Sequence, residues 1–374
     1  MTIAYFVDGL NRGGVEVVVS QLANSFSRLG HEVHVVCMFH DKRDMVPELS
    51  EAVSIHYLPF DSCKSHYVQY LRYLPCLKRL LKEINPSVIH AHNFSFSYFF
   101  LSIAILLSRI STQNIRSIHF AGFFLERRTV VDRLRFFFDY LASRLLRATI
   151  ISVSPTVAAK VVDLYPANRH LTITNGIDTE GKFSKKNITK SSLGIDEKRL
   201  VVAYVSRICA GKNHETLLRA WEKVVKEEPS ALLILIGDGP LREYCQSIIR
   251  SKGLENSILF TGSLPHVEKY LSIADIGVFP SESEGLGLGL LEMMSMQLPV
   301  VASRIPAFYD IIQENTTGIL FNTFDSDELA CKILALLSNR NLRAQLGNNA
   351  RGYVQQHYSF DGMIAQHKAS YDND

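Results

Sequence analysis

The sequence lacks the cysteine patterns and the long apolar runs that mark secreted, zinc-binding or membrane-spanning proteins. Its six cysteines are scattered over 374 residues, and no C-x-x-C pair occurs. This pattern excludes a disulfide framework and a cysteine zinc site, and it indicates buried thiols in a reducing compartment. The most apolar segment, residues 93–108, is shorter than the roughly 20 residues that span a bilayer, so we expect a buried or interfacial helix there. No basic flank with an apolar core opens the chain, and we expect a cytoplasmic protein.

An excess of charge of either sign is also missing. The chain has 40 basic and 37 acidic residues, a net charge of +3, so its overall charge does not favour a nucleic-acid partner. Hydrophobic residues make up 47% of the chain and charged residues 21%, which is typical of a globular protein. A chain of 374 residues is too long for one ordinary core and favours two domains.

Short apolar runs alternate with helical patterns along most of the chain. The candidate strands are residues 2–7, 31–38, 87–92, 115–120 and 149–154, then 200–206, 231–237, 257–262, 275–281, 298–303 and 318–321. Near-continuous apolar strands separated by helices indicate parallel sheets covered on both faces. The sequence therefore predicts an α/β protein with two doubly wound, Rossmann-like domains that face a central cleft. A polar, turn-rich stretch, residues 174–192, places their boundary near 178–179.

The stretch "ESEGLGLGLLE", residues 282–292, lies between a candidate strand and a helix. A helix N-terminus at the carboxyl end of a strand favours an anion, and the glycines, Gly285 and Gly287 among them, let a ligand approach the backbone. Yet Glu284 and Glu292 frame the glycines. Because a carboxylate only accepts hydrogen bonds, its natural partner is a pair of hydroxyl groups, as on a sugar or a ribose. A nucleotide-sugar, with a sugar at each end of a diphosphate, reconciles the two features.

Cations for such a diphosphate occur earlier in the same half of the chain. Arg207 follows a candidate strand, and Lys212 follows in the loop before a helix. A planar guanidinium and a compact ammonium suit phosphate oxygens. Their summed charge matches that of a diphosphate diester, so we expect no metal and no other cofactor.

These residues resemble the retaining glycosyltransferases of family 4, which have the GT-B fold. The segment "SESEGLGLGLLEMMSMQLPVVAS" resembles the E-x7-E signature of that family, and "VSRICAGKN" resembles its donor loop. The segments "DGLNRGGVE", "IRSIHF", "TNGID" and "LLILIGDGPLRE" follow the family pattern as well. The resemblance covers nearly the whole chain.

The resemblance implies a role for each matching position. Residues 1–178 would bind the acceptor, with a C-terminal helix in residues 358–374 crossing back onto them, and residues 179–357 would bind the donor. Arg207 and Lys212 would hold the diphosphate, Glu292 the ribose and Glu284 the transferred sugar. The other implied positions are Gly13, Gly14 and Glu16 in the loop that closes over the donor, the backbone of Gly285, Leu286 and Gly287, and His119 beside the reacting sugar.

The chain departs from the family pattern at a few positions. The family has Phe where Leu286 stands, and glycine at the positions of Ser206, Asn213 and Gln297. The three replaced glycines predict a local change of backbone. No departure removes a side chain that the resemblance assigns to the site.

The implied reaction is metal-independent transfer of a sugar, with retention of anomeric configuration, from a nucleoside-diphosphate sugar to a glycan or lipid-linked saccharide in polysaccharide or lipopolysaccharide synthesis. Two carboxylates flanking a bond are typical of glycoside hydrolases, but we assign neither glutamate as a nucleophile. Two segments could suggest a metal site. We interpret "DSDE" at 325–328 as a helix N-cap with an acidic first turn. We expect His90 and His92 to serve packing or a cleft edge, because no third ligand is near.

Basic and aromatic residues gather in the first half of the chain. The arginines between residues 116 and 147 are Arg116, Arg127, Arg128, Arg133, Arg135, Arg144 and Arg147. Phe136, Phe137 and Phe138 lie among them, and a second basic stretch begins at Lys64. Such a surface suits an anionic membrane leaflet or a pyrophosphate-linked lipid, which predicts peripheral attachment at the cytoplasmic face. Ordinary amphipathic helices with solvated arginines are the alternative.

Two other classes of function stay open. A Rossmann-type epimerase or oxidoreductase requires a G-x-G-x-x-G turn after its first strand and an acidic ribose reader after its second, and neither occurs here. A non-catalytic sugar-binding relative would have lost some of the residues that this chain retains. The pattern does not distinguish a uridine from a guanosine donor, and it leaves the sugar and the acceptor open.

Overall fold

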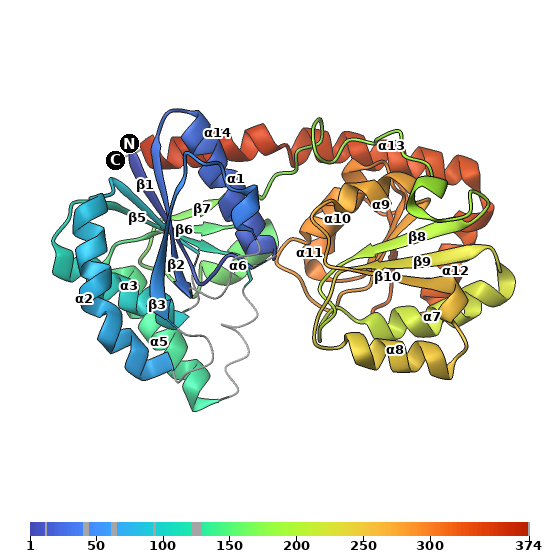
Figure 1. Ribbon diagram of the computed structural model, residues 1–374, viewed down its shortest axis with the longest axis horizontal. Coiled ribbons are helices and arrows are strands. Elements are labelled where there is room, and N and C mark those ends of the chain that lie inside the picture. Colours follow the sequence, from blue (N-terminus) through green and yellow to red (C-terminus); the bar gives the residue numbers. More distant parts are fainter. Residues whose placement is uncertain (12, 40–44, 61–65, 93–94, 121–128, 373–374) are drawn as a thin grey trace. The chain divides into compact units, whose positions relative to one another are not determined.

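The structure, a computed structural model, describes residues 1–11, 13–39, 45–60, 66–92, 95–120 and 129–372. The chain divides into two compact units: unit 1 is Met1–Thr174 with Ile364–Asp374, and unit 2 is Asn175–Met363. Each unit contains one sheet whose paired strands are parallel (Figure 1). The predicted class, two doubly wound α/β domains, is confirmed. The divisions between units lie at 174–175 and 363–364, whereas the sequence analysis places them at 178–179 and 357–358.

Unit 1 has a seven-stranded sheet in the order β3-β2-β1-β4-β5-β6-β7. Its strands are β1 (Thr2–Val7), β2 (Glu32–Phe39), β3 (Ser54–Phe60), β4 (Val88–Ala91), β5 (Gln113–Ile118), β6 (Thr149–Ser152) and β7 (His170–Thr172). Its helices are α1 (Gly14–Arg28), α2 (His66–Ile84), α3 (Ser95–Ser108), α5 (Val130–Leu145) and α6 (Pro155–Val161), with a 3-10 turn at Val46–Glu48. The strand order reverses between β1 and β4, which makes the carboxyl ends of these two strands the expected ligand site.

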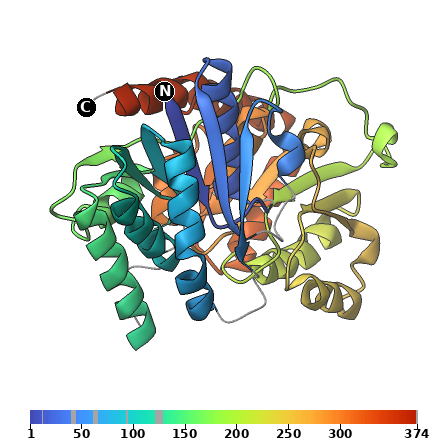
Figure 2. The same ribbon diagram turned by 60° about the vertical axis from the view of Figure 1, so that its left-hand side comes forward.

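Helices cover both faces of the unit 1 sheet. The helices α2, α3 and α5 pack side by side on one face, and α1 lies on the other (Figures 1 and 2). The last helix of the chain, α14 (Phe360–Asp372), reaches unit 1 with its final residues, where the Tyr371 ring lies 4.8 Å from that of Phe26 in α1. The apolar segment 93–108 forms α3 over Ser95–Ser108, which buries Tyr98 and Leu101 and exposes Leu106.

Unit 2 repeats the same winding with a six-stranded sheet in the order β10-β9-β8-β11-β12-β13. Its strands are β8 (Leu200–Val205), β9 (Ala231–Ile236), β10 (Ile258–Gly262), β11 (Ile276–Phe279), β12 (Val300–Ser303) and β13 (Ile319–Phe321). Its helices are α7 (His214–Glu227), α8 (Arg242–Ser251), α9 (Val267–Ile273), α10 (Leu288–Ser295), α11 (Pro306–Tyr309), α12 (Ser326–Ser338) and α13 (Arg340–His357), with 3-10 turns at Ser191–Leu193 and Glu255–Ser257. The reversal here lies between β8 and β11.

Two smaller predictions meet the structure differently. The side chain of Asp325 accepts hydrogen bonds from the backbone N–H groups of Asp327 and Glu328, which confirms the predicted N-cap of α12. The prediction of buried thiols is wrong for Cys331, which is exposed on α12, because the buried residues of that helix, such as Ala330 and Ile333, lie on its other side. Cys63 lies outside the described residues. None of the helices within the described residues is both long and apolar enough to cross a membrane.

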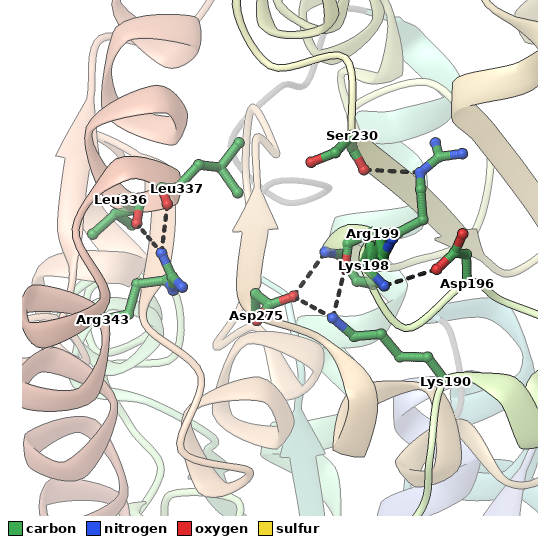
Figure 3. A network of polar contacts seen from close by, with 10 residues as sticks. Lys190, Asp196, Lys198, Arg199, Ser230, Asp275, Leu336, Leu337 and Arg343 are labelled. Atoms are coloured by element: carbon green, nitrogen blue, oxygen red, sulfur yellow. Dashed lines mark hydrogen bonds and ion pairs between the residues drawn. The ribbon is translucent and has the colours of Figure 1, made fainter.

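A polar network ties the segment that enters unit 2 to the amino end of its sheet (Figure 3). One carboxylate oxygen of Asp275 accepts hydrogen bonds from the backbone N–H of Val201, at 2.8 Å, and from Nζ of Lys190, at 3.0 Å. The same Lys190 ammonium donates to the carbonyl of Arg199 at 2.6 Å, and Arg199 Nε donates to the carbonyl of Ser230 at 2.8 Å. The side chains of Lys190 and Asp275 are only 15% and 24% exposed, so water screens this ion pair weakly.

Removing the carboxylate should therefore destabilise unit 2. We expect Asp275→Ala to lower the free energy of unfolding by about 2 kcal/mol, because it leaves the ammonium and a backbone N–H without their acceptor. Asp275→Asn retains an acceptor and should cost about half as much. Urea unfolding of the full chain measures both. The control is Asp196→Ala, since within the described residues the exposed side chain of Asp196 accepts one hydrogen bond, from the N–H of Lys198. Equal effects of Asp275→Ala and Asp196→Ala would contradict the assignment.

Candidate functional site

The residues that the sequence singles out in unit 2 follow the two strands at its reversal of order. Arg207 and Lys212 lie in the loop after β8, and residues 284–287 lie in the loop after β11. Glu292 is in α10, the helix that this second loop enters. Parallel strands end at one edge of a sheet, so both loops lie where a doubly wound domain binds its ligand.

Lys212 and Glu284 join the two loops in an ion pair between Nζ and Oε1. Their side chains are 24% and 12% exposed, which shields the pair from most of the solvent. Two further bonds hold the backbone: the hydroxyl of Tyr204 donates to the carbonyl of Lys212 at 2.8 Å, and the N–H of Glu282 donates to the carbonyl of Gly211 at 2.9 Å. Arg207 is exposed, and its side chain makes no ion pair within the described part of the chain.

Gly287 shapes the start of α10. It is the N-cap residue with φ of 93°, a left-handed conformation, and no side chain caps the helix. A Cβ atom at this position would lie 2.8 Å from Cε1 of Phe308, so glycine is required for both reasons. The first N–H groups of α10 are left to bind an anion. Gly289 serves packing instead, since a Cβ there would lie 2.9 Å from the carbonyl oxygen of Val205.

Glu292 is held in a setting that disfavours its charge. Burial raises the pKa of its carboxyl to about 7; the charge of Lys182 opposes this shift and that of Glu268 adds to it. Glu292 is partly buried, and a carboxylate in such a setting without a strong partner of opposite charge is costly. A ligand that donates hydrogen bonds to Glu292 would relieve this cost, which is the behaviour expected of a binding residue.

Two of the residues that stand where the family has glycine have a backbone conformation that favours glycine. Asn213 has φ of 53° and Gln297 has φ of 59°. Both residues therefore have the left-handed backbone that glycine adopts most readily, and the change of backbone relative to the family stays a prediction. Asparagine tolerates the left-handed region better than most residues, and glutamine adopts it at a cost of about 1–2 kcal/mol.

The unit 1 residues of the prediction follow β1 and β5. Gly13 is the N-cap of α1, in ordinary extended geometry, and Gly14 is the first residue of that helix. The carboxylate of Glu16 folds back over Gly13, where a Cβ atom would lie 2.5 Å from its Oε2. Any larger residue at position 13 would displace Glu16. His119 directly follows β5.

His119 is paired with a second histidine that sequence reasoning assigned only to packing or a cleft edge. Its Nε2 lies 2.8 Å from Nδ1 of His92, which follows β4, and the ring centroids are 5.1 Å apart. Burial, and then the charge of Arg116, lowers the pKa of His119 to about 4, so the imidazole is neutral at pH 7. The sequence contained one sign of a histidine cluster here, which is the period-two spacing of His90 and His92. This spacing places both rings on one face of the sheet, with centroids 4.2 Å apart.

A cavity of about 330 Å³ lies in unit 2 beside the loops of Lys212 and Glu284, over the N-terminus of α7. Its lining includes Cys209, Asn213, Tyr244 and Phe324 but none of the side chains that the sequence assigns to the donor. Gly211, Asn213 and Glu282, which lie within two residues of Lys212 or Glu284, also line it, so the cavity adjoins the candidate site. Among the residues that the structure describes, no group of three or more His, Cys, Asp or Glu residues is arranged to hold a metal ion.

Comparison with known proteins gives a consistent set of relatives. A family model described as Glycosyltransferase Family 4 matches residues 12–181, and one described as Glycosyl transferases group 1 matches residues 185–353. An uncharacterized glycosyltransferase of Methanocaldococcus jannaschii is 24% identical over 373 residues, 95% of this chain and 93% of the relative. The N-acetyl-alpha-D-glucosaminyl L-malate synthase of Bacillus anthracis is 28% identical over 227 residues, 59% of this chain and 58% of the synthase.

A solved structure extends the likeness to the fold. The structure of Anabaena Alr3699/HepE in complex with UDP and glucose superposes with a TM-score of 0.85 at 18% identity, covering 100% of both chains. At this identity the match concerns the fold, and it includes both units.

The setting of Glu292 leads to a test that depends on the protein alone. Its folded-state pKa of about 7 exceeds the ordinary value of 4.5, so the folded state holds this proton more tightly and stability falls as pH rises from 4.5 to 7. Glu292→Gln removes that fall. We expect the variant to gain about 3 kcal/mol over the unmodified chain at pH 8 relative to pH 4.5, measured by urea unfolding. Glu282→Gln, at an exposed position, is the control, and a gain independent of pH would refute the assignment.

Proposed function

Because the chain belongs to glycosyltransferase family 4 and has the GT-B fold, we propose that it transfers one sugar from a nucleoside-diphosphate sugar to a glycan or lipid-linked saccharide, with retention of anomeric configuration and without a metal ion. The acceptor we propose is a growing polysaccharide or lipopolysaccharide. The observation that carries the proposal is the pairing of Lys212 with Glu284 beside the uncapped start of α10.

The diphosphate would lie between the loops that follow β8 and β11. Departure of the nucleoside diphosphate is the difficult step, because negative charge develops on the leaving oxygen while the anomeric carbon becomes cation-like. Arg207, Lys212 and the N–H groups at the start of α10 are positive groups already in place at one edge of the sheet. Groups preorganised in this way stabilise a developing charge without reorganising during the reaction.

Hydroxyl groups of the donor would donate hydrogen bonds to the carboxylates of Glu284 and Glu292. Glu292 would accept from the ribose, which relieves its buried charge, and Glu284 would accept from the transferred sugar while Lys212 turns its remaining N–H groups to the phosphate. An ammonium has three donors, so one Lys212 can serve both partners. Glu284 in a tight ion pair is a weak nucleophile, which favours front-face attack by the acceptor hydroxyl over a covalent intermediate. HepE, whose structure contains UDP and glucose, supports a uridine donor.

The donor test is a thermal-shift screen of uridine- and guanosine-diphosphate sugars against the full chain, followed by an assay of nucleoside-diphosphate release. We expect one donor class to raise the unfolding temperature, and Arg207→Ala or Lys212→Ala to weaken its binding at least tenfold, since each removes a charged hydrogen bond.

Two controls accompany that screen. Lys226→Ala removes a cation of the same unit that pairs with Glu222 on the surface, and it should leave binding unchanged. EDTA should leave both binding and release unchanged. Activity that disappears with EDTA and returns with Mn²⁺ would overturn the metal-independent mechanism, and release of a reduced nicotinamide cofactor instead of a nucleoside diphosphate would overturn the transferase.

Unit 1 also supports a proposed attachment to an anionic membrane surface. Helix α5 exposes a stripe at helical spacing: Val130 is 72% exposed, Leu134 48% and Phe137 54%. Exposed arginines at 133, 135 and 144 lie along the same helix, and exposed Arg147 follows its end. An apolar stripe with flanking cations is typical of helices that lie in a membrane interface. Arg116 does not contribute to this surface, because it is 2% exposed and pairs with buried Asp139; Lys64, Arg127 and Arg128 lie outside the described residues.

The membrane proposal is tested by sedimentation with vesicles. We expect the full chain to bind vesicles rich in phosphatidylglycerol at low salt, and to bind less as salt screens the arginines. The double variant Leu134→Ala with Phe137→Ala should bind at least fivefold more weakly, because it removes apolar area from the contact. Phe324→Ala, which removes a 64% exposed side chain of unit 2, is the matched control. Absence of binding at low salt would refute the proposal.

A further inference from the structure

We propose that His92 is a positioning residue for His119: its Nδ1–H donates to Nε2 of His119, which orients that ring and leaves the proton of His119 on Nδ1. This inference rests on the proposed function, because it concerns the histidine expected beside the transferred sugar. It goes beyond that function in naming the group that sets the tautomer of His119.

The geometry brings the two rings together from adjacent strands. β4 and β5 pair in parallel, with Ala91 opposite Arg116, so the residues that follow them leave the sheet side by side. Nδ1 of His92 and Nε2 of His119 are 2.8 Å apart, which is a normal hydrogen-bond length. Two neutral imidazoles can form this bond only if one nitrogen carries the proton and the other is bare.

Burial decides that neither ring is charged. It lowers the pKa of His92 well below its ordinary value and that of His119 to about 4. The positive charge of Arg116, which is 2% exposed, acts on both rings in the same direction. A second proton on the facing nitrogens would make one of the two rings a cation, beside the cation of Arg116. The pair therefore holds a single proton between its facing nitrogens at neutral pH.

The other nitrogen of His92 decides where that proton lies. Its Nε2 is buried and has no hydrogen-bond partner among the described residues. If Nε2 carried the proton, an N–H donor would be buried without an acceptor, and orphaned buried N–H groups are rarer than orphaned acceptors. The proton is therefore on Nδ1 of His92, which becomes the donor. Nε2 of His119 accepts, and its own proton lies on Nδ1.

A buried network fixes the ring of His92 in turn. Its backbone N–H donates to the carbonyl of Phe6 at 2.8 Å, and its ring lies against that of His90. His90 is itself held from both sides, by the hydroxyl of Tyr371 at 2.7 Å and by that of Ser117 at 2.8 Å. Tyr371 comes from α14, so the last helix of the chain supports the histidine pair. A site residue supported in this way keeps its orientation when a ligand binds.

The assigned tautomer limits what His119 can do. With Nε2 engaged by His92, Nδ1–H is the group left for a ligand. It can donate to an oxygen of the transferred sugar or of the acceptor. It cannot serve as a general base through Nε2 unless the bond to His92 breaks. The structure thus assigns His119 as a neutral donor.

The first measurement needs no substrate. In the full chain with ¹⁵N-labelled histidine, long-range proton–nitrogen correlation spectra distinguish a protonated from a bare ring nitrogen. The His119 signals are assigned by their loss in His119→Gln. We expect a protonated Nδ1 and a bare Nε2 for His119, and the same pattern for His92. A protonated Nε2 on His119 would overturn the proposal whatever the substrate proves to be.

The second measurement compares two variants of similar size. His92→Asn keeps a donor near the position of Nδ1, and His92→Leu removes it. With the donor sugar found by the screen, we expect His92→Leu to lower kcat about 10- to 100-fold and His92→Asn to recover it to within about threefold, with donor affinity unchanged in both. Tyr371→Phe, which breaks the bond to His90 but not the bond to His119, controls for damage to the buried network.

The two measurements separate failure of this inference from failure of the proposed function. If no nucleoside-diphosphate sugar is turned over, the transferase proposal fails while the spectrum of the unmodified chain still tests the tautomer. If His92→Leu and His92→Asn lose the same activity while circular dichroism shows both folded, the positioning role is refuted. If neither variant folds, the spectrum of the unmodified chain decides alone.

Discussion

The reversal of strand order between β8 and β11 is the constraint that governs the candidate site. Strands are added outward from β8 on one side and from β11 on the other, so the loops that leave these two strands turn away from each other above the sheet. In doubly wound sheets a ligand binds between two such loops. The arrangement of the two loops also lets Lys212 meet Glu284, although 72 positions separate them in the sequence. The same reversal between β1 and β4 sets the surroundings of His92 in unit 1.

The central strands of the unit 1 sheet were predictable from sequence, and its two edge strands were not. Every predicted strand corresponds to a strand of the structure, because a parallel strand buried on both faces consists almost entirely of apolar residues. The two strands missing from the prediction, β3 and β7, are the two edges of the unit 1 sheet. β3 contains His56 and Pro59, and β7 is half exposed. An edge strand is covered on fewer sides, so its composition carries a weaker signal.

The candidate site shows a similar division. Spacing and residue type located Arg207, Lys212 and the two glutamates, because the loop positions relative to strands follow from the order of elements. Pairing could not be predicted in the same way. The bond between His92 and His119 depends on which strands are neighbours, and the support of His90 by Tyr371 joins residues 281 positions apart. Nor did the replaced glycines reveal that Asn213 and Gln297 have positive φ, since side-chain identity restricts φ without determining it.

The ion pair between Lys212 and Glu284 has a consequence for selectivity. The carboxylate of Glu284 is the counterion of the Lys212 ammonium, so the positive charge of Lys212 is neutralised before any ligand binds. A free inorganic anion would compete with Glu284 for Lys212, and it would offer the carboxylate of Glu284 no hydrogen-bond donor in place of the ammonium. A molecule that presents phosphate oxygens and alcohol groups together satisfies both partners at once. Under the proposed function this ion pair would discriminate against simple inorganic anions before any contact with base or sugar has formed.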